Sequence, residues 1–331
     1  MIINSSFVPK RGLSSPHIQT IYGTLFNRQK LPAYQEERLE LDDGDFIDLL
    51  WVTTGVAADA PLIVLLHGLG GGLQSTYVAS LLNSFNRAGF RAVLMFFRGA
   101  SNEPNRLMRA YHSGDTHDFD FLLQTIAVRE PHTIKLAVGI SLGGNVLLKW
   151  MGEKGTQPLL QGGVAVSVPF DLATVVQRVD QGFSKIYQRH LLKKLQTIFL
   201  KKMNIQQDSY PFSQRDLLSI RTLYEFDQVV TAPLHGFLDA ESYYHQSSSR
   251  QYLKNIQVPC FIIHAEDDPF MLPHVIPSDS ELSKSVCLEL SKHGGHVGFV
   301  TNHRKNNGTP FWLETRVVKL LQQLIEPQLR V

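Results

Sequence analysis

The stretch that decides the fold reads TIKLAVGISLGGNVLLKW and spans Thr133–Trp150. Its apolar run, Ile134–Val138, is typical of a buried strand, and the residues after position 145 have the apolar spacing of a helix. Between the two lie Gly139, Ser141 and Gly143, the G-x-S-x-G pattern of a tight strand-to-helix turn. Glycine at both outer positions leaves room where larger side chains would collide. The pattern therefore predicts an α/β protein in which Ser141 is pushed out above a sheet edge.

The motif alone is weak evidence for chemistry. Three fixed positions recur by chance on the order of 0.1 times in a chain of this length. A glycine-rich turn whose serine only caps the following helix would give the same letters. Residues elsewhere in the chain must therefore decide whether Ser141 has a structural or a chemical role.

Composition limits the classes of protein to which the chain can belong. Of its 331 residues, 43% are hydrophobic, and the formal net charge of +2 gives no basis for phosphate-driven binding of nucleic acid. Cys260 and Cys287 are far apart, lack the spacing of metal ligands and lie in apolar runs, so we expect buried thiols and no metal. The N-terminus has no apolar signal region, and no apolar stretch is long enough to span a membrane. These features predict a globular protein of the cytoplasm.

The strand and helix patterns predict one core with an insertion. Residues 1–35 contain few periodic runs and are expected to form an arm laid over the rest of the chain. Buried strand patterns alternate with helical ones over 36–169 and resume over 251–331, which predicts a mostly parallel, doubly wound α/β sheet. A turn at 42–45 between two strand patterns predicts an antiparallel hairpin at the start of this sheet. Residues 170–250 show helical patterns only, so we expect a helical cap, or lid, inserted into the core.

A glycine-rich loop, His67–Gly72, follows the apolar strand pattern at 62–66. It lacks the Lys-Ser/Thr of a P-loop and the longer pattern of a dinucleotide site, so we expect no cofactor. Such a loop can instead donate a backbone N–H group to an oxyanion. We expect the donors to be the N–H groups of Leu69 and of Leu142, which directly follows Ser141.

A serine hydroxyl becomes a good nucleophile when a histidine takes its proton and a carboxylate orients that histidine. Where the serine lies on a turn of this kind, the acid and the histidine are expected after later strands, in that order. Asp267 and Asp268 follow one such strand pattern, and His293 and His296 follow the next. We prefer Asp268, which directly precedes a proline, and His296, which lies deeper in its glycine loop. Asp267 and His293 remain the alternatives.

Several further motifs carry a resemblance to a known family. They are SPHIQT (15–20), LDDGD (41–45), HGL (67–69), FRG (97–99), EPNR (103–106), YHSG (111–114), HAEDDPFM (264–271) and HGGHVGF (293–299). With these motifs the chain resembles the α/β-hydrolase superfamily, and within it the YheT-type esterases (AB hydrolase 4 family), over nearly its whole length. The resemblance implies hydrolysis of carboxylic esters through Ser141, Asp268 and His296. Phe97 stands where many α/β-hydrolases carry an aspartate.

The expected cap contains a basic amphipathic segment, Lys185–Lys202. Its apolar residues can form one helix face, with Lys193, Lys194, Lys201 and Lys202 largely on the other. One interpretation is a lid helix packed over a pocket. The other is an interfacial helix that makes transient contact with anionic lipid at a membrane surface. Both imply an apolar acyl site.

The leading interpretation is a serine carboxylic-ester hydrolase of the esterase or acylglycerol-lipase type, acting through an acyl-enzyme on Ser141. Its substrate would be a small ester with an apolar acyl chain. One alternative is an acyltransferase with the same three residues, in which an alcohol replaces water. Another is a binding protein that keeps the α/β-hydrolase fold without turnover, although such a protein has no need of all three residues.

Overall fold

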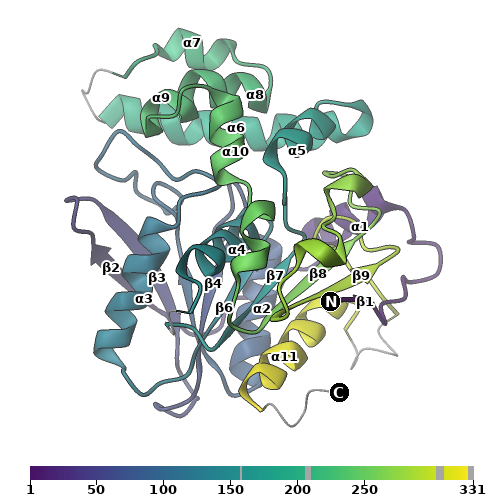
Figure 1. Cartoon of the computed structure of the whole chain (residues 1–331). Coiled ribbons are helices and arrows are strands. Elements are labelled where there is room, and N and C mark those ends of the chain that lie inside the picture. Colours follow the sequence, from purple (N-terminus) through teal and green to yellow (C-terminus); the bar gives the residue numbers. More distant parts are fainter. Residues whose placement is uncertain (157–158, 206–209, 303–308, 327–331) are drawn as a thin grey trace.

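The computed structural model of the protein describes residues 1–156, 159–205, 210–302 and 309–326. Within them, nine strands form one sheet in the order β1-β9-β8-β7-β6-β4-β5-β3-β2 (Figure 1). The strands are β1 (Ile2–Asn4), β2 (Gln35–Glu40), β3 (Phe46–Val52), β4 (Leu62–Leu66), β5 (Arg91–Met95), β6 (Lys135–Ile140), β7 (Gly162–Val166), β8 (Cys260–Ala265) and β9 (Val286–Ser291). The β2–β3 and β3–β5 pairs are antiparallel and the other neighbours are parallel. The predicted α/β fold and its antiparallel hairpin are confirmed.

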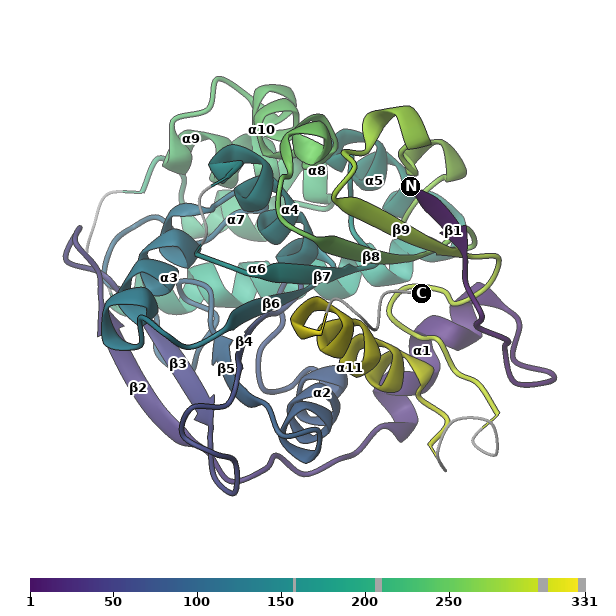
Figure 2. The ribbon, with the colours of Figure 1, turned by 60° about the horizontal axis from the view of Figure 1, so that its bottom comes forward.

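Helices cover both faces of this sheet. α3 (His117–Arg129) and α4 (Leu142–Lys154) pack on one face, and α2 (Thr76–Arg87) and α11 (Trp312–Ile325) pack on the other (Figure 2). Strands β4 to β7 are buried along their whole length. Because neither of their faces meets water, their sequences are largely apolar runs without polar alternation.

The segment between β7 and β8 contains helices and, in its described part, no strand. Its helices are α5 (Leu172–Val179), α6 (Lys185–Ile205), α7 (Gln214–Ser219), α8 (Leu223–Phe226), α9 (Ala232–His235) and α10 (Ala240–Ser247), with a π-helical turn at Asp227–Thr231. Short 3-10 helices lie at Gly182–Ser184, Arg250–Asn255, Pro273–Val275 and Asp279–Glu281. Helices α5 to α10 lie together above the sheet in Figure 1 and share an apolar cluster of their own. They cover the sheet edge that carries Ser141.

Two lysines of the basic segment Lys185–Lys202 do not lie on an outer face of α6. Lys202 is fully buried, and its Nζ donates to the backbone carbonyl of Leu107 at 2.6 Å. The Nζ of Lys194 donates to the carbonyl of Gly70 at 3.0 Å. The expected grouping of four lysines on one polar face is wrong for these two, because core loops pack along α6 and present carbonyl groups that need donors.

The first 35 residues contact the core at β9 and at the loop that follows β9. β1 pairs in parallel with β9 at the sheet edge, and α1 (Pro16–Phe26) packs against the loop that follows β9. Neither element was predicted from the sequence pattern. β1 has three residues, and the buried residue of α1 is the polar Gln19, so neither element shows an apolar pattern of its own.

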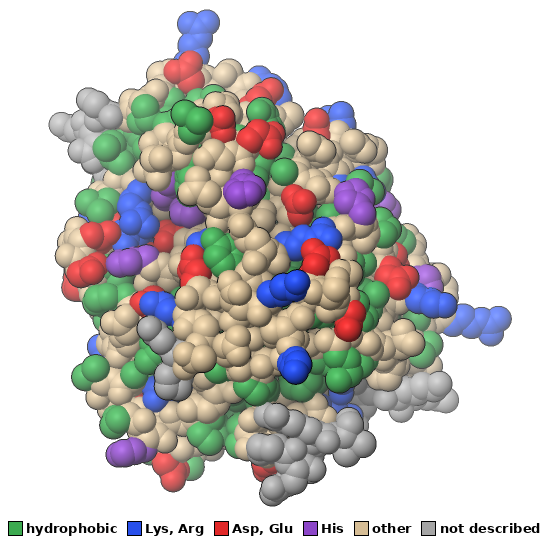
Figure 3. Space-filling view, in the orientation of Figure 1, with side chains coloured by type: hydrophobic (Ala, Val, Ile, Leu, Met, Phe, Trp, Pro, Cys, Tyr) green, Lys and Arg blue, Asp and Glu red, His purple; other side chains and the backbone are tan. Residues whose placement is uncertain are grey.

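The surface mixes both signs of charge, and one of the two cysteines is less buried than expected. The face seen in Figure 3 carries acidic and basic side chains interspersed rather than gathered by sign. Both cysteines are free thiols, with Cys260 buried and Cys287 half-buried. No helix among the described residues is long and apolar enough to cross a membrane.

Candidate active site

Ser141 lies on a strained turn between β6 and α4. Its φ of 54° and ψ of −117° are rare for a residue with a side chain. Such a conformation costs on the order of 1–3 kcal/mol and persists where the surroundings enforce it. Here the Ser141 N–H donates to the carbonyl of Val166 at 2.8 Å, and the Ser141 carbonyl accepts from the N–H of Asn145 at 3.0 Å.

The two flanking glycines are required by close contacts. A Cβ atom at Gly139 would overlap the backbone of Gly143. One at Gly143 would lie 2.7 Å from the carbonyl oxygen of His67 and closer still to that of Leu66. The predicted crowding is therefore present, but much of it comes from the end of β4 rather than from the turn itself.

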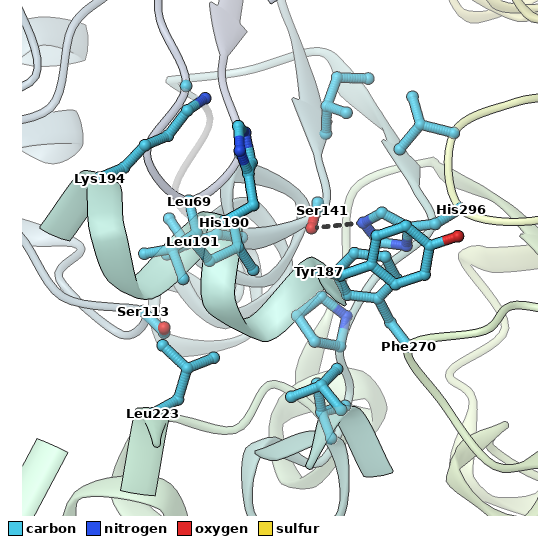
Figure 4. A pocket seen from close by; sticks show the side chains of 18 of the residues that line it. Leu69, Ser113, Ser141, Tyr187, His190, Leu191, Lys194, Leu223, Phe270 and His296 are labelled. Atoms are coloured by element: carbon cyan, nitrogen blue, oxygen red, sulfur yellow. Dashed lines mark hydrogen bonds between the residues drawn. The ribbon is translucent and has the colours of Figure 1, made fainter. Parts of the chain in front are cut away.

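The structure brings Asp268 and His296 to Ser141. His296 Nε2 lies 2.9 Å from Ser141 Oγ (Figure 4). His296 Nδ1 lies 2.7 Å from Asp268 Oδ2. The Asp268 side chain is 1% exposed, and its Oδ1 accepts the N–H of Phe270 at 2.9 Å. The Phe270 ring stacks on the imidazole with its centroid 4.1 Å away. With Nδ1–H donating to Asp268, Nε2 can accept the proton of Ser141.

Asp267 and His293 form a separate pair beside this one. His293 Nδ1 lies 3.2 Å from Asp267 Oδ2, and Asp267 Oδ1 accepts the N–H of Gly295 at 2.9 Å. The His293 side chain is 46% exposed, whereas that of His296 is 11% exposed. Burial raises the pKa of Asp267 above its ordinary value. The sequence left the choice between two aspartates and between two histidines open. Asp267 and His293 hold the loop and do not reach Ser141.

The N-terminal segment supports the loop that carries His296. Thr20 Oγ1 accepts the backbone N–H of His296 at 2.9 Å. Gln19 Oε1 accepts the N–H of Val300 at 2.6 Å, and its Nε2 donates to the Val300 carbonyl at 3.1 Å. Gly298 lies so close to the backbone of Gln19 that a Cβ atom would overlap it. This contact was not predicted from the sequence. The one sequence feature that could have indicated it is the SPHIQT motif, which contains Gln19 and Thr20.

The expected oxyanion donors lie next to the serine. In the described part of the chain, the backbone N–H groups of Leu69 and Leu142 have no hydrogen-bond partner. The neighbouring N–H groups are occupied, because Gly68 donates to the hydroxyl of Tyr77 at 2.9 Å and Gly70 donates to that of Tyr111 at 2.7 Å. This arrangement leaves Leu69 and Leu142 available to an incoming oxygen.

Buried polar contacts hold the glycine loop in place. His67 Nδ1 lies 2.8 Å from the Gly68 carbonyl, and its Nε2 accepts the N–H of Phe97 at 3.3 Å. Burial lowers the pKa of His67 to about 4, so this ring is neutral. Phe97 stacks on Tyr111 with centroids 5.2 Å apart. The phenylalanine that replaces the usual aspartate therefore packs against the tyrosine that supports the loop.

A cavity of about 520 Å³ opens in front of Ser141 and His296. Apolar side chains from α5, α6 and α8 line its larger part, among them Val175, Val176, Leu195, Ile198, Phe199 and Phe226. Thr24, Ser75 and Thr76 line the part between α1 and α2. No group of three or more His, Cys, Asp or Glu side chains in the described residues is arranged to hold a metal ion.

Comparisons with known proteins identify the family. The model of the alpha/beta hydrolase fold matches residues 61–303. Over 328 residues the chain is 40% identical to "Putative esterase YheT" of Escherichia coli (strain K12), covering 98% of this chain and 95% of that protein. It is 29% identical over 247 residues to "Monoacylglycerol lipase" of Saccharomyces cerevisiae (strain ATCC 204508 / S288c), covering 72% of this chain and 55% of that protein.

Solved structures agree on the fold. The esterase Pf2001 of Pyrococcus furiosus superposes with a TM-score of 0.58 at 14% identity, and the match covers 98% of each chain. At this identity the likeness concerns the fold alone. Together, the sheet, the match to the family model and the identity to YheT show that the chain belongs to the α/β-hydrolase family, as a YheT-type hydrolase.

Proposed function

We propose that the protein is a serine carboxylic-ester hydrolase in which Ser141, His296 and Asp268 carry the reaction. The observation that carries this proposal is the pair of hydrogen bonds, 2.9 Å and 2.7 Å long, that links the three side chains in front of a largely apolar cavity. The names of the relatives YheT and monoacylglycerol lipase, one an esterase and one a lipase, support the same reaction class.

The mechanism follows from the positions of these groups. Ser141 Oγ attacks the ester carbonyl while His296 Nε2 takes its proton, and Asp268 stabilises the imidazolium that forms. The carbonyl oxygen becomes an oxyanion that accepts from the N–H groups of Leu69 and Leu142, each such donor being worth about 2.7–4 kcal/mol. His296 then gives the proton to the alcohol oxygen, which leaves an acyl-enzyme on Ser141. Water activated by His296 attacks the acyl group and releases the acid.

The shape of the cavity supports an ester with an apolar acyl chain. The helices within residues 170–250 act as a cap whose side chains from α5, α6 and α8 enclose that chain. The alcohol part lies toward the polar side chains between α1 and α2. Since Lys194 and Lys202 turn inward, we place any contact with a membrane surface at the start of α6 and the 3-10 helix before it, where Ile186 and Phe183 are about half exposed.

The test is hydrolysis of p-nitrophenyl esters from acetate to palmitate by the wild-type protein and Ser141→Ala side by side. We expect turnover by the wild type only, with thermal unfolding of the two proteins nearly equal, because alanine fits the same backbone. The acyl-chain length that gives the highest rate reports the depth of the apolar part of the cavity. Equal rates in both proteins, or no rate on any ester, would contradict the proposal.

The same assay separates hydrolysis from acyl transfer. An alcohol such as glycerol is added, and the free acid and the new ester are measured together. A hydrolase releases mainly acid at low alcohol concentration, where water is in large excess. A new ester that dominates at low alcohol concentration would identify an acyltransferase acting through the same residues.

A further inference from the structure

Lys194 is the only lysine or arginine among the described residues that line the cavity. It lies on α6, half-buried, and its Nζ donates to the carbonyl of Gly70 at 3.0 Å. Its stem packs on the same glycine, since a Cβ atom there would lie 2.9 Å from Lys194 Cδ. Figure 4 shows the side chain reaching from α6 toward the loop that carries Leu69.

The charge of Lys194 has no counter-ion among the described residues. Two carboxyl groups line the cavity, and both are bound elsewhere. Asp227 accepts from the hydroxyls of Thr231 and Tyr244, at 2.7 Å and 2.8 Å. Glu314 accepts from Ser80 Oγ at 2.6 Å.

The other titratable groups of the lining do not pair with this charge. Burial raises the pKa of Asp227 to about 6 and that of Glu314 to about 7, so Glu314 is only partly ionised near neutral pH, whereas Asp227 stays largely ionised but is bonded to Thr231 and Tyr244. Burial lowers the pKa of both His112 and His235 to about 3, so these rings are neutral. Lys194 is therefore a positive charge in the cavity wall that no carboxylate of the described residues pairs with.

An ammonium group taken partly out of water without a counter-ion is costly, and burial accordingly lowers the pKa of Lys194. The group has three N–H donors, and Gly70 accepts one of them. An anionic ligand in the cavity would accept from the others and restore the lost solvation, since charge-assisted hydrogen bonds are the strong ones.

We propose that Lys194 forms an anion subsite and that the substrate is an ester carrying a carboxylate or phosphate group a few bonds from its scissile carbonyl. This proposal rests on the proposed ester hydrolysis in so far as it calls the anionic ligand a substrate. The anion subsite itself requires only that such a ligand binds. Gly70 directly follows Leu69, so an anion on Lys194 would bind at the same glycine loop that carries an expected oxyanion donor.

Lys194 also has a simpler role that must be separated from this one. Its bond to Gly70 ties the cap to the glycine loop, and that tie alone would affect every ligand equally. An anion subsite affects only charged ligands. The ratio of affinities for a neutral and an anionic ligand of the same shape therefore distinguishes the two roles.

The experiment measures binding in the Ser141→Ala protein, in which esters are not cleaved, by titration calorimetry. The probes are octyl phosphate, octyl hydrogen succinate and, as the neutral match, methyl octyl succinate. Lys194→Met keeps an unbranched stem on Gly70, and Lys194→Arg keeps the charge. Lys193→Met removes an exposed charge one residue away on the same helix and serves as the control.

We expect Ser141→Ala to bind the two anionic probes at least about tenfold more tightly than the neutral one. The preference should vanish in Lys194→Met, survive in Lys194→Arg and Lys193→Met, and weaken as salt is added. The tighter of the two anionic probes identifies phosphate or carboxylate as the natural group.

A preference that survives in Lys194→Met, or the absence of any preference in Ser141→Ala, would overturn the subsite. An equal loss for all three probes in Lys194→Met would assign Lys194 to the cap–loop tie alone. Because nothing is turned over in this experiment, its failure is distinct from a failure of ester hydrolysis, which the p-nitrophenyl assay reports by itself.

Discussion

The two acid–histidine pairs beside Ser141 allow a matched test of which one works in catalysis. We predict that Asp268→Asn nearly abolishes ester hydrolysis and that Asp267→Asn leaves it almost unchanged. Both substitutions remove one negative charge from adjacent residues, so general electrostatic effects are alike. They differ in which histidine loses its carboxylate.

The expected size of the effect follows from the contacts. Asp268 Oδ2 is 2.7 Å from His296 Nδ1, and an asparagine amide there can donate to Nδ1 instead of accepting from it. The proton of the ring then moves to Nε2, which can no longer accept from Ser141. A change of this kind lowers kcat by about 10⁴-fold, equivalent to about 5 kcal/mol at the transition state.

The control has a different environment. Asp267 pairs with a histidine that is 46% exposed, and exposed pairs are worth about 0–1 kcal/mol. An asparagine at 267 can still accept the N–H of Gly295 through its side-chain oxygen. We expect kcat within about threefold of the wild type, because His296 keeps its partner and its position.

The assay is the steady-state kcat on p-nitrophenyl butyrate, with thermal unfolding as the check that each variant is folded. Similar kcat values in the two variants would refute the reasoning. A large loss in Asp267→Asn with activity kept in Asp268→Asn would transfer the role to the other pair.

Three further predictions concern stability. Burial raises the pKa of Glu314 from 4.5 to about 7, so the folded state keeps a proton that the unfolded state releases, and the stability of the protein falls as pH rises through this window. We therefore expect Glu314→Gln to raise the free energy of unfolding by up to about 3 kcal/mol at pH 8 and to leave it unchanged near pH 4.5, as measured by urea unfolding. Gly143→Ala should cost about 1–3 kcal/mol and most of the activity, because its Cβ meets the backbone of β4; an unchanged Tm would contradict this. Lys202→Met should cost about 3 kcal/mol and Lys201→Met almost none, since only Lys202 is buried on loop carbonyls; equal unfolding midpoints would disprove the difference.

Much of the core and the position of the serine could be predicted from the sequence, because the constraints are local. A strand, a turn and a helix are encoded in the consecutive residues around Ser141, and a fully buried strand has a composition of its own. The meeting of the serine, the acid and the histidine then follows from the parallel sheet, since the carboxyl ends of its strands lie at one edge. The sheet and its hairpin are confirmed, whereas the roles of the three residues stay predictions.

Long-range packing could not be predicted in the same way. Helical periodicity placed Lys194 and Lys202 with their exposed neighbours, because the pattern of a single helix contains no information on loops packed along its other side. In the sequence, only the proline that follows Asp268 distinguishes Asp268 from Asp267. The support of the His296 loop by Thr20 joins residues 276 positions apart, and no local pattern reports such a contact.

The support of His296 by α1 also bears on how the molecule acquires activity during synthesis. Thr20 precedes His296 by 276 positions, so the helix leaves the ribosome well before the loop that it braces. Ser141 and its turn are made before that loop, and under the proposed mechanism the base, His296, is held in position only once the two distant segments meet. A chain that stops before this loop would therefore contain Ser141 without His296, and we expect no ester hydrolysis from it.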